Sequence, residues 1–235
     1  MAERPYTVLS CAMSIDGYID SATRKPLTLS NVADLDRVDA VRASCDAILV
    51  GATTVRNDNP RLEVRSPARR SDRLARGLPE SPIKVTVIGR AQLDPEAKFF
   101  AVGNSEKLVY CTSAALDRAR VRLGSVATVI EGGQPVELRR VSENLHRRGV
   151  RRLMVEGGET VNTQFLTDDL ADELQLVVAP FFVGDPSARR FVHGGRFPWT
   201  PDRRATLAEV RPLGDVVLLR YALSSRFGTD SPREA

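Results

Sequence analysis

Short apolar runs alternate along the 235-residue chain with segments whose apolar residues recur at helical spacing. Runs rich in Val, Ile and Leu predict strands, and the amphipathic segments between them predict helices. Strands are expected at Tyr6–Met13, Ala47–Val50, Lys84–Ile88, Leu108–Cys111, Val126–Ile130, Leu153–Glu156 and Glu173–Ala179. Helices are expected at Ala33–Ser44, Thr53–Asn57, Ala114–Leu123, Glu137–Arg148 and Thr160–Leu166. This alternation is typical of an α/β fold with a mostly parallel sheet and crossover helices.

The C-terminal part of the chain departs from this alternation. Ala205–Pro212 and Val216–Leu223 flank Leu213-Gly214-Asp215, a turn sequence that predicts an antiparallel hairpin. Three segments are expected to be irregular: Leu62–Pro82, interpreted as a surface loop, Phe181–Arg204, and a polar tail over 226–235. Because no internal repeat or shift in composition divides the chain, a single domain is expected over residues 1–225.

The helix expected at Ala33–Ser44 has a simple pattern. Its apolar residues fall on one face, which is expected to be the buried face: Ala33, Leu35, Val38 and Val41. Either Asn31 or Ser30 precedes it as a candidate N-cap, because both side chains can accept a hydrogen bond from a first-turn N–H group.

The net charge of +4 and the pI near 9.2 come almost entirely from arginine. Arginine suits bidentate contact with a phosphate or carboxylate, which favours a phosphorylated small molecule as the ligand. The basic residues are spread along the chain apart from Arg65 to Arg76, interpreted as an exposed loop, and no nucleic-acid motif is present. No secretory signal or membrane-length apolar run appears, so a cytoplasmic location is expected.

The cysteines and histidines argue against metal chemistry. Cys11, Cys45 and Cys111 are odd in number and widely spaced, and they are expected to be small buried hydrophobic residues. The two histidines are too few for a histidine-rich metal centre or a histidine-based triad, so no metal site is expected. His146 is expected on a solvated helix face, and the role of His193 is left open.

Glu156-Gly157-Gly158 joins a predicted strand directly to a predicted helix. Glycines let the backbone turn sharply and approach a ligand, and a helix N-terminus presents N–H groups and a positive dipole end to an anion. The turn is therefore either a phosphate-binding corner or only a tight connection between strand and helix.

Two further segments become informative when they are read with this turn. Ala12-Met13-Ser14-Ile15-Asp16-Gly17 follows the first strand, and Arg42 to Arg65 reads RASCDAILVGATTVRNDNPRLEVR. Later, Asp172-Glu173-Leu174 precedes a P-x-x-x-G stretch. This ordered set resembles the riboflavin-biosynthesis reductases, both the reductase domain of the bacterial bifunctional deaminase–reductase and its stand-alone relatives. The resemblance covers roughly residues 5 to 223.

The resemblance implies a dihydrofolate-reductase-like fold, a homodimer and NADPH as hydride donor. It implies 5-amino-6-(5-phosphoribosylamino)uracil reductase activity, in which the ribosyl group of a phosphorylated pyrimidine becomes a ribityl chain. A cofactor that carries the chemistry leaves the protein to bind, orient and exclude water, and this agrees with a site built from glycines, hydroxyls and arginines. Neither nucleic acid nor a membrane is expected as a partner.

The cofactor residues implied by the resemblance come from four places in the chain. Those at the end of the first strand would line the nicotinamide cleft: Ala12 and the stretch Ser14–Gly17, with Asp16 and Gly17 as the named positions. Those after the second strand match cofactor-contacting positions: Gly51, Thr54 and Asp58. Those at the glycine turn and in the stretch Gly158–Gln164 would hold the pyrophosphate, with Gly157, Gly158, Glu159, Thr160 and Val161 as the named positions. Arg90 follows a strand and is placed to meet the 2′-phosphate of NADPH.

The substrate residues are carried over in the same way. Arg42 and Arg65 match substrate-phosphate positions, Leu62 packs beside the pyrimidine, and Glu156 pairs with ring amino groups. Asp58 and Glu156 are the candidate catalytic residues, and Asp58 either holds a ribose hydroxyl or helps a proton reach the reacting oxygen. From the residues alone, Asp58-Asn59-Pro60 also fits a plain turn, and Arg42 a cation at a helix C-terminus.

The chain departs from the common bacterial pattern in its substrate half. Many bacterial members have a Lys at the position of Ser10, and a Ser and a Trp where this chain has Pro26 and Thr28. One alternative is therefore an NADPH-dependent reductase of a pterin, dihydrofolate or another amino-pyrimidine in specialised metabolism. Another, of a different class, is a non-catalytic nucleotide-binding protein with the same fold.

Overall fold

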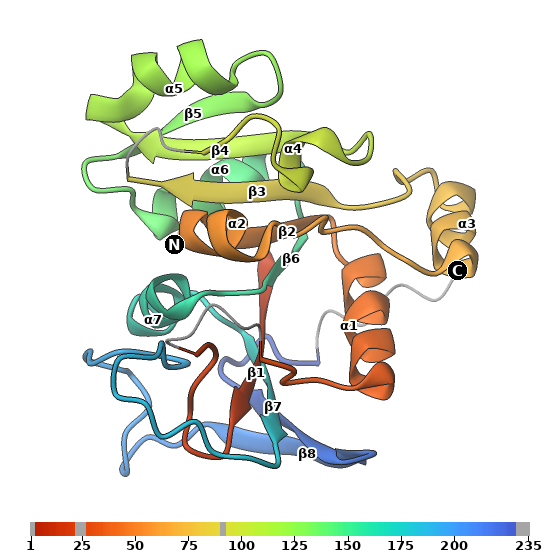
Figure 1. Ribbon diagram of the computed structural model, residues 1–235, viewed down its shortest axis with the longest axis vertical. Helices are drawn as coiled ribbons and strands as arrows, with labels where there is room; N and C mark the ends of the chain where they lie inside the picture. The colour runs from red at the N-terminus through yellow and green to blue at the C-terminus, as the bar shows by residue number, and fades with distance from the viewer. Residues whose placement is uncertain (1–2, 22–26, 90–92, 229–235) are drawn as a thin grey trace. The chain divides into compact units, whose positions relative to one another are not determined.

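The computed structural model describes residues 3–21, 27–89 and 93–228 (Figure 1). Its strands are β1 (Tyr6–Ser14), β2 (Ala47–Gly51), β3 (Ile83–Ile88), β4 (Lys107–Thr112), β5 (Thr128–Gly133), β6 (Arg152–Val155), β7 (Glu173–Ala179), β8 (Thr206–Leu213) and β9 (Val216–Ala222). Its α-helices are α1 (Val32–Ser44), α2 (Ala52–Asp58), α3 (Pro67–Ala75), α4 (Lys98–Ala101), α5 (Leu116–Leu123), α6 (Leu138–Arg147) and α7 (Glu159–Thr167). Every strand and helix expected from the sequence is present, with ends that differ by a few residues.

The chain divides into two compact units. Unit 1 comprises Met1–Pro5 and Asp39–Met154, and unit 2 comprises Tyr6–Val38 and Val155–Ala235. The expectation of a single domain over residues 1–225 stays a prediction.

Unit 1 contains the strand order β5-β4-β3-β2-β6. The pairs β2–β3, β3–β4 and β4–β5 are parallel, as the alternation of strands and helices predicts. All five residues of β2 are buried. A strand covered on both faces reads as a continuous apolar run, which explains the sequence AILVG. Figure 1 shows α5 packed beside β5 in this unit.

Unit 2 contains the strand order β1-β7-β9-β8. β1 and β7 are parallel, whereas β9 pairs antiparallel with both β7 and β8, so the predicted C-terminal hairpin is confirmed. Gly214 in the connecting turn has a φ of +65°, a conformation that favours glycine. Val177, Ala179, Val216 and Leu218 form a buried cluster on one face of this sheet.

The predicted buried face of α1 is wrong. Ala33 and Leu35 are exposed, while Asp34 and Asp39 are buried on the same helix. The reason is hydrogen bonding, because each buried carboxylate accepts several bonds that an apolar residue cannot make. Asn31 is the residue that caps the helix, since its Oδ1 accepts the backbone N–H of Asp34 at 3.0 Å.

The interpretation of Leu62–Pro82 as a surface loop is also wrong, because the segment contains α3. Ser66 caps this helix by accepting the backbone N–H of Arg69 at 3.4 Å, and Pro67 occupies its first position. Arg73 on α3 is only 2% exposed, so the stretch Arg65 to Arg76 is not simply an exposed loop. The short helix α4 was likewise not expected from the sequence.

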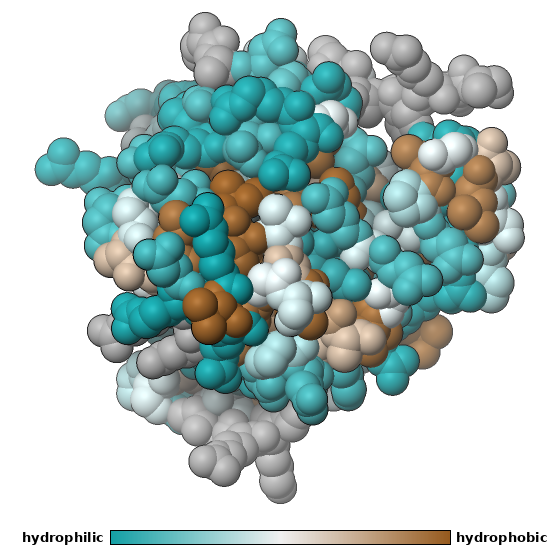
Figure 2. Space-filling model, turned by 90° about the horizontal axis from the view of Figure 1, so that it is seen from above, coloured by the Kyte–Doolittle hydropathy of each residue, from teal (hydrophilic) through white to brown (hydrophobic). Residues whose placement is uncertain are grey.

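The remaining expectations concern single residues and the end of the chain. Cys45 and Cys111 are buried, as expected, and Cys11 is half-buried; all three are free thiols. Residues 229–235 of the expected tail lie outside the described residues, whereas Arg226 pairs with Asp172 at 3.2 Å. The face drawn in Figure 2 is mostly hydrophilic, with apolar residues in patches. Within the described part of the chain, no helix combines the length and apolarity needed to cross a membrane.

Candidate active site

In unit 2, the chain turns sharply where β1 ends. The Ser14 hydroxyl donates to Asp16 Oδ1 at 2.5 Å and accepts the backbone N–H of Tyr18 at 3.0 Å. The backbone N–H of Gly17 donates to the Ser14 carbonyl at 2.9 Å, and its φ of +86° explains the need for glycine. The S-x-D-G sequence is therefore a turn in which each polar residue has a structural partner.

The carboxylate of Asp16 fastens this turn to the segment that follows β7. Its Oδ2 accepts the backbone N–H of Gly184 at 2.8 Å, and its Oδ1 accepts that of Val183 at 3.1 Å. Desolvation opposes the charged form, but the bonds from Ser14 and these amides prevail and lower the pKa of Asp16 to about 2. Asp16 thus joins the first motif to the P-x-x-x-G stretch, and its contact with a cofactor stays a prediction.

The glycine turn after β6 leads directly into α7. Gly157 has a φ of +87°, Gly158 stands at the N-cap position, and the helix begins at Glu159. A Cβ atom at Gly157 would lie 3.2 Å from both Oδ1 and Nδ2 of Asn162, so the backbone passes close to that side chain. Glu156, which the sequence assigns to the substrate, precedes the turn and is half-buried.

Asn162 lies in the stretch Gly158–Gln164 that was expected to hold the pyrophosphate, but the sequence assigned it no role of its own. It is fully buried on α7, and its Nδ2 donates to the Phe191 carbonyl at 3.1 Å and contacts Cys11 Sγ at 3.8 Å. Its Oδ1 is a buried polar atom with no hydrogen-bond partner among the described residues. The sequence signal for its burial was an amide residue on the apolar face of a helix, beside Val161 and Phe165.

The segment from Arg189 to His193 joins the two parts of unit 2 that were assigned to the cofactor. On one side, the backbone N–H of Phe191 donates to the Gly17 carbonyl at 2.9 Å. On the other, the backbone N–H of Arg190 donates to Glu159 Oε1 at 3.0 Å. The Arg190 guanidinium also lies 4.4 Å from the centre of the Tyr18 ring, close enough for a cation–π contact. The role of this irregular segment, left open by the sequence, includes holding the β1 turn against α7.

His193 takes part in the same segment through its main chain. Its backbone N–H donates to Thr163 Oγ1 at 3.1 Å, whereas its exposed ring bonds only to the neighbouring Gly194 carbonyl among the contacts described. The main chain of His193, rather than its ring, therefore anchors the segment to α7. His146, by comparison, is half-buried on α6 with Nε2 3.0 Å from Glu3 Oε2.

The glycine turn leaves the start of α7 without a side-chain cap. A glycine at the N-cap brings no side chain to cap the first-turn N–H groups of α7, so these groups suit an external anion. The Glu159 carboxylate would repel a phosphate, but it accepts a hydrogen bond from the backbone N–H of Arg190. The backbone N–H of Glu159 itself is one of the first-turn N–H groups of α7. Thr160 is exposed in the same first turn, whereas Val161 is buried. Half-buried Ala12 lies near the end of β1.

In unit 1, the predicted residues follow β2. Gly51 is buried at its end, Thr54 is half-buried in α2, and Asp58 is exposed at the last position of that helix. Asn59 closes α2 with a φ of +44°, and its Oδ1 accepts the backbone N–H of Lys98 at 2.7 Å. The turn interpretation therefore holds for Asn59, while the assignment of Asp58 stays a prediction.

The next segment carries two of the predicted substrate residues. Leu62 has a φ of +50° and is only 2% exposed, an unusual backbone conformation for a buried, non-glycine residue. Arg42 Nη1 donates to the Glu63 carbonyl at 3.3 Å, and the Arg65 side chain is 52% exposed. Arg42 thus contacts the segment that carries Arg65, and the role of both arginines in an anion site stays a prediction.

Two predicted positions lie outside the described residues: Arg90 and Pro26. Of the other departures from the bacterial pattern, Ser10 is buried in β1 and Thr28 is exposed. The structure therefore groups the predicted residues of unit 2 around the β1 turn and α7, and those of unit 1 around β2, α2 and the segment after it.

Comparisons with known proteins identify the family of this chain. Residues 5–219 match the RibD C-terminal domain family. The chain is 34% identical over 226 residues to 2,5-diamino-6-ribosylamino-4(3H)-pyrimidinone 5′-phosphate reductase of Archaeoglobus fulgidus, covering 95% of this chain and 99% of that protein. It is 35% identical over 224 residues to the protein of the same name from Methanothermobacter thermautotrophicus, covering 94% and 99%.

Solved structures show the same fold. A pyrimidine reductase-like protein from Corynebacterium diphtheriae has a TM-score of 0.81 at 22% identity, covering 93% of this chain and 91% of that one. RibD of Acinetobacter baumannii has a TM-score of 0.75 at 25% identity, covering 93% and 58%. The fold is thus the mixed α/β fold of the pyrimidine reductases. The chain belongs to the RibD C-terminal domain family, and the resemblance found in its motifs is confirmed.

Proposed function

We propose that this chain is an NADPH-dependent reductase of riboflavin biosynthesis that acts in the cytoplasm on a phosphoribosylamino-pyrimidine. Its substrate is the pyrimidinone with two ring amino groups, 2,5-diamino-6-ribosylamino-4(3H)-pyrimidinone 5′-phosphate. The observation that carries this proposal is the match along 95% and 94% of the chain to two reductases named for that compound. The carboxylate of Glu156 supports it, because a carboxylate accepts hydrogen bonds from ring amino groups.

The residues of unit 2 bind and orient the cofactor in this proposal. NADPH supplies a hydride when it is bound. The first turn of α7 holds the pyrophosphate through backbone N–H groups, and Gly157 lets the chain approach it. Asp16 and the segment from Arg189 to His193 keep the β1 turn in place, so that Ala12 and Gly17 line the nicotinamide. Arg90 meets the 2′-phosphate.

In this proposal, the residues of unit 1 hold the substrate and help a proton reach the ribose ring oxygen. Reduction adds a hydride to the ribose C1′ and breaks its bond to the ring oxygen, which takes up a proton. Asp58, exposed at the end of α2, assists that proton transfer or holds a ribose hydroxyl, beside Thr54. Arg42 and Arg65 bind the 5′-phosphate, and Leu62 packs beside the pyrimidine.

Turnover with defined substrates tests the proposal. The protein is mixed with NADPH and either the diamino-pyrimidinone phosphate or the corresponding 5-amino-uracil phosphate, and the absorbance of the reduced nicotinamide is followed. We expect oxidation with both compounds, a higher kcat/KM with the diamino compound, and much slower oxidation of NADH. If neither compound causes NADPH oxidation at high protein concentration, the proposal is wrong. Faster oxidation with the uracil compound would overturn the choice of substrate only.

Replacing Arg65 with alanine is expected to lower kcat/KM for the phosphorylated substrate about 30-fold, because a hydrogen bond to a charged group contributes about 1.5–3 kcal/mol. The Kd for NADPH should remain within about twofold of the wild-type value, and the dephosphorylated substrate should be equally poor for both proteins. Arg61→Ala, which removes an exposed arginine from the same segment, is the control. Equal losses for substrate and NADPH would place Arg65 outside the phosphate site.

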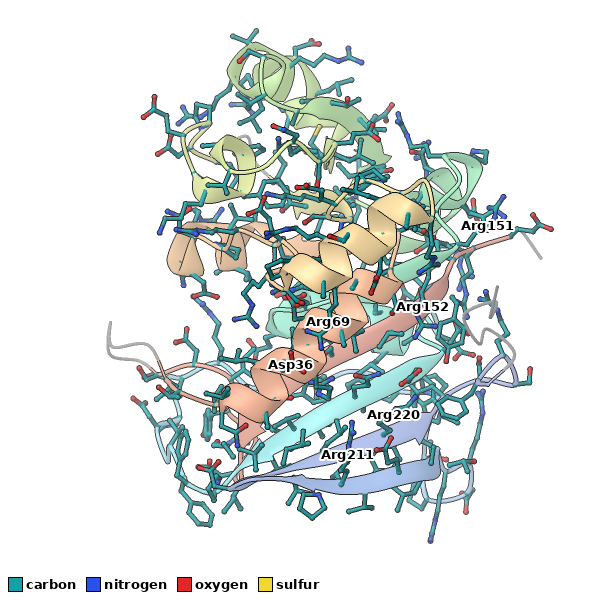
Figure 3. The ribbon with its side chains drawn as sticks, turned by 90° about the vertical axis from the view of Figure 1, so that its right-hand side faces the viewer. Asp36, Arg69, Arg151, Arg152, Arg211 and Arg220 are labelled. Atoms are coloured by element: carbon teal, nitrogen blue, oxygen red, sulfur yellow. The ribbon has the colours of Figure 1, made fainter. Side chains whose placement is uncertain are left out.

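We also propose that the chain forms a homodimer through one face of the sheet in unit 2. Alternating residues of β7, β9 and β8 give this face only apolar side chains and proline: Leu174, Leu176, Val178, Val217, Leu219, Tyr221, Leu207, Val210 and Pro212. Val210 is 57% exposed, Leu207 51% and Val217 38%. The charged residues of the hairpin, including Arg211 and Arg220, lie on the opposite face (Figure 3). A twofold axis brings the same face of two copies together, and an apolar face without charges can meet its own copy without repulsion.

Replacing Val210 with aspartate is expected to convert the dimer into a monomer, because two carboxylates would be buried in the interface without partners. The mass in solution, measured by light scattering after size-exclusion chromatography, checks this. Val121→Asp is the control, since Val121 is a 90% exposed valine on α5 in unit 1. A wild-type monomer, or a Val210→Asp dimer, would contradict the proposed interface.

A further inference from the structure

A buried carboxylate on α1 holds the main chain of the segment that carries Arg65. Asp39 is 2% exposed, and its Oδ1 accepts the backbone N–H of Arg65 at 2.5 Å. Its Oδ2 accepts the backbone N–H of Ser66 at 3.1 Å and Arg69 Nη1 at 2.9 Å. Figure 3 labels Arg69, which projects from α3 beside α1. One carboxylate thus fixes two consecutive amides and the first turn of α3.

The charge of Asp39 makes these bonds strong. Burial raises the pKa of this carboxyl, but the amides of Arg65 and Ser66 and the guanidinium of Arg69 outweigh it and hold the pKa below its usual range. Asp39 is therefore charged at neutral pH, where a carboxylate only accepts hydrogen bonds. Amide and guanidinium bonds to a charged oxygen are about twice as strong as those between neutral groups.

Asp39 holds the backbone of Arg65 more closely than its side chain. The bond to the backbone N–H is 2.5 Å long, whereas Arg65 Nε is 3.7 Å from Asp39 Oδ1. The Arg65 side chain is half-exposed, so the carboxylate fixes the point from which the guanidinium extends without burying it. An arginine held in this way can still bind an anion from solution.

A second residue of α1 acts on the same segment. Arg42, one turn after Asp39, donates to the Glu63 carbonyl at 3.3 Å, and Ser81 Oγ accepts the backbone N–H of Val64 at 3.0 Å. Each residue from Glu63 to Ser66 thus has a polar partner for its main chain. Two residues of α1, Asp39 and Arg42, therefore hold the main chain of this segment at Glu63, Arg65 and Ser66.

We infer that Asp39 is the positioning residue for recognition of the substrate phosphate. By fixing the main chain at Arg65 and Ser66, it aims the Arg65 guanidinium at the 5′-phosphate and sets its distance from Arg42. This inference rests on the proposed function, in which Arg65 contacts that phosphate. Without the hydrogen bonds to Asp39, Arg65 would still be present but displaced. A displacement of about 1 Å is enough to lose much of the binding free energy of a contact.

The test compares two buried aspartates of the same helix. Asp39→Asn keeps the shape of the side chain and removes its charge and one acceptor. The control is Asp34→Asn, because Asp34 is equally buried on α1 but accepts bonds from Ser30 Oγ at 2.5 Å and Arg37 Nε at 2.7 Å instead. For each variant, kcat/KM is measured with the phosphorylated and the dephosphorylated substrate, and amide hydrogen exchange is measured at Arg65 and Ser66.

Asp39→Asn is expected to reduce the preference for the phosphorylated substrate about 10-fold and to leave the KM for NADPH unchanged. It should also speed amide exchange at Arg65 and Ser66. Asp34→Asn should change neither the preference nor this exchange, although it lowers stability. In an Arg65→Ala background, Asp39→Asn should have no further effect on the preference, because the group that it positions is gone.

The outcomes separate this inference from the proposed function. If Arg65→Ala leaves the phosphate preference unchanged, the assignment of the phosphate site fails. If Arg65→Ala lowers the preference but Asp39→Asn does not, or lowers it no more than Asp34→Asn, the inference about Asp39 is overturned. Unchanged exchange at Arg65 and Ser66 overturns it as well, whether or not the chain turns over either compound. Asp39→Ala provides the same comparison if the asparagine still holds both amides.

Discussion

Replacing Gly157 with alanine is expected to raise the Kd for NADPH by roughly 10- to 100-fold, the effect of a displacement of about 1 Å in a binding group. Two physical effects add at this position. The φ of +87° disfavours any residue with a Cβ atom, and that atom would lie 3.2 Å from the Asn162 amide. Asn162 is buried and bonded to the Phe191 carbonyl, so the glycine turn itself must shift. The first-turn amides of α7 would then miss the pyrophosphate.

Gly149→Ala is the matched control for this prediction. Gly149 has a φ of +92°, but a Cβ atom there would meet nothing within 4 Å. Both variants should lose about 1–2 kcal/mol of stability from the left-handed backbone. Only Gly157→Ala should lose affinity for NADPH, measured by fluorescence titration or calorimetry. Equal NADPH affinities in the two variants would mean that the glycine turn does not bind the cofactor.

Strands could be predicted from the sequence wherever burial imposes a simple pattern. β2 reads as an unbroken apolar run because both of its faces are covered, and the hairpin of β8 and β9 is marked by Gly214 in its turn. Helices that bury polar side chains could not be predicted from such a pattern. α1 buries Asp34 and Asp39 while Leu35 is exposed, because both carboxylates accept hydrogen bonds. The partners of Asp34 are its neighbours Ser30 and Arg37, whereas those of Asp39 come from a distant segment that local periodicity does not encode.

α3 was missed for a related reason. Its only fully buried side chain is Arg73, so the helix has no apolar stripe to predict it. Two local signals were nevertheless present, a serine at the N-cap position followed by a proline at the first helical position. Read as helix-start signals instead of loop punctuation, Ser66 and Pro67 would have predicted this helix.

The candidate site could be predicted only where a motif is contiguous. The glycine turn and the S-x-D-G turn were found because their residues are neighbours in the sequence. The sequence did not indicate that Asp16 would bond to the amides of Val183 and Gly184, or that Asn162 would meet Phe191. Such pairs are more than 25 residues apart or lie in irregular segments, and folding alone brings them together. They determine how rigidly the motif residues are held.

Replacing Arg73 with methionine is expected to lower the free energy of unfolding by on the order of 3 kcal/mol. Arg73 donates to three backbone carbonyls, those of Pro79, Ala43 and Cys45, each at 2.8 Å. Methionine keeps most of the apolar volume but leaves these acceptors without their donor, and an unpaired buried acceptor costs about 1–3 kcal/mol. The melting temperature should fall by roughly 6–12 °C for a chain of this size.

Thermal and urea unfolding of three variants checks this expectation. Arg76→Met, at the exposed end of the same helix, should stay within about 0.5 kcal/mol of the wild type. The stability of Arg73→Lys should fall between those of the two methionine variants. An ammonium group is compact and lacks the planar fork of donors with which a guanidinium reaches all three carbonyls. If Arg73→Met is no less stable than Arg76→Met, the three carbonyls are satisfied without Arg73. In that case the buried arginine does not hold α3 against the end of α1 and Cys45, which follows it.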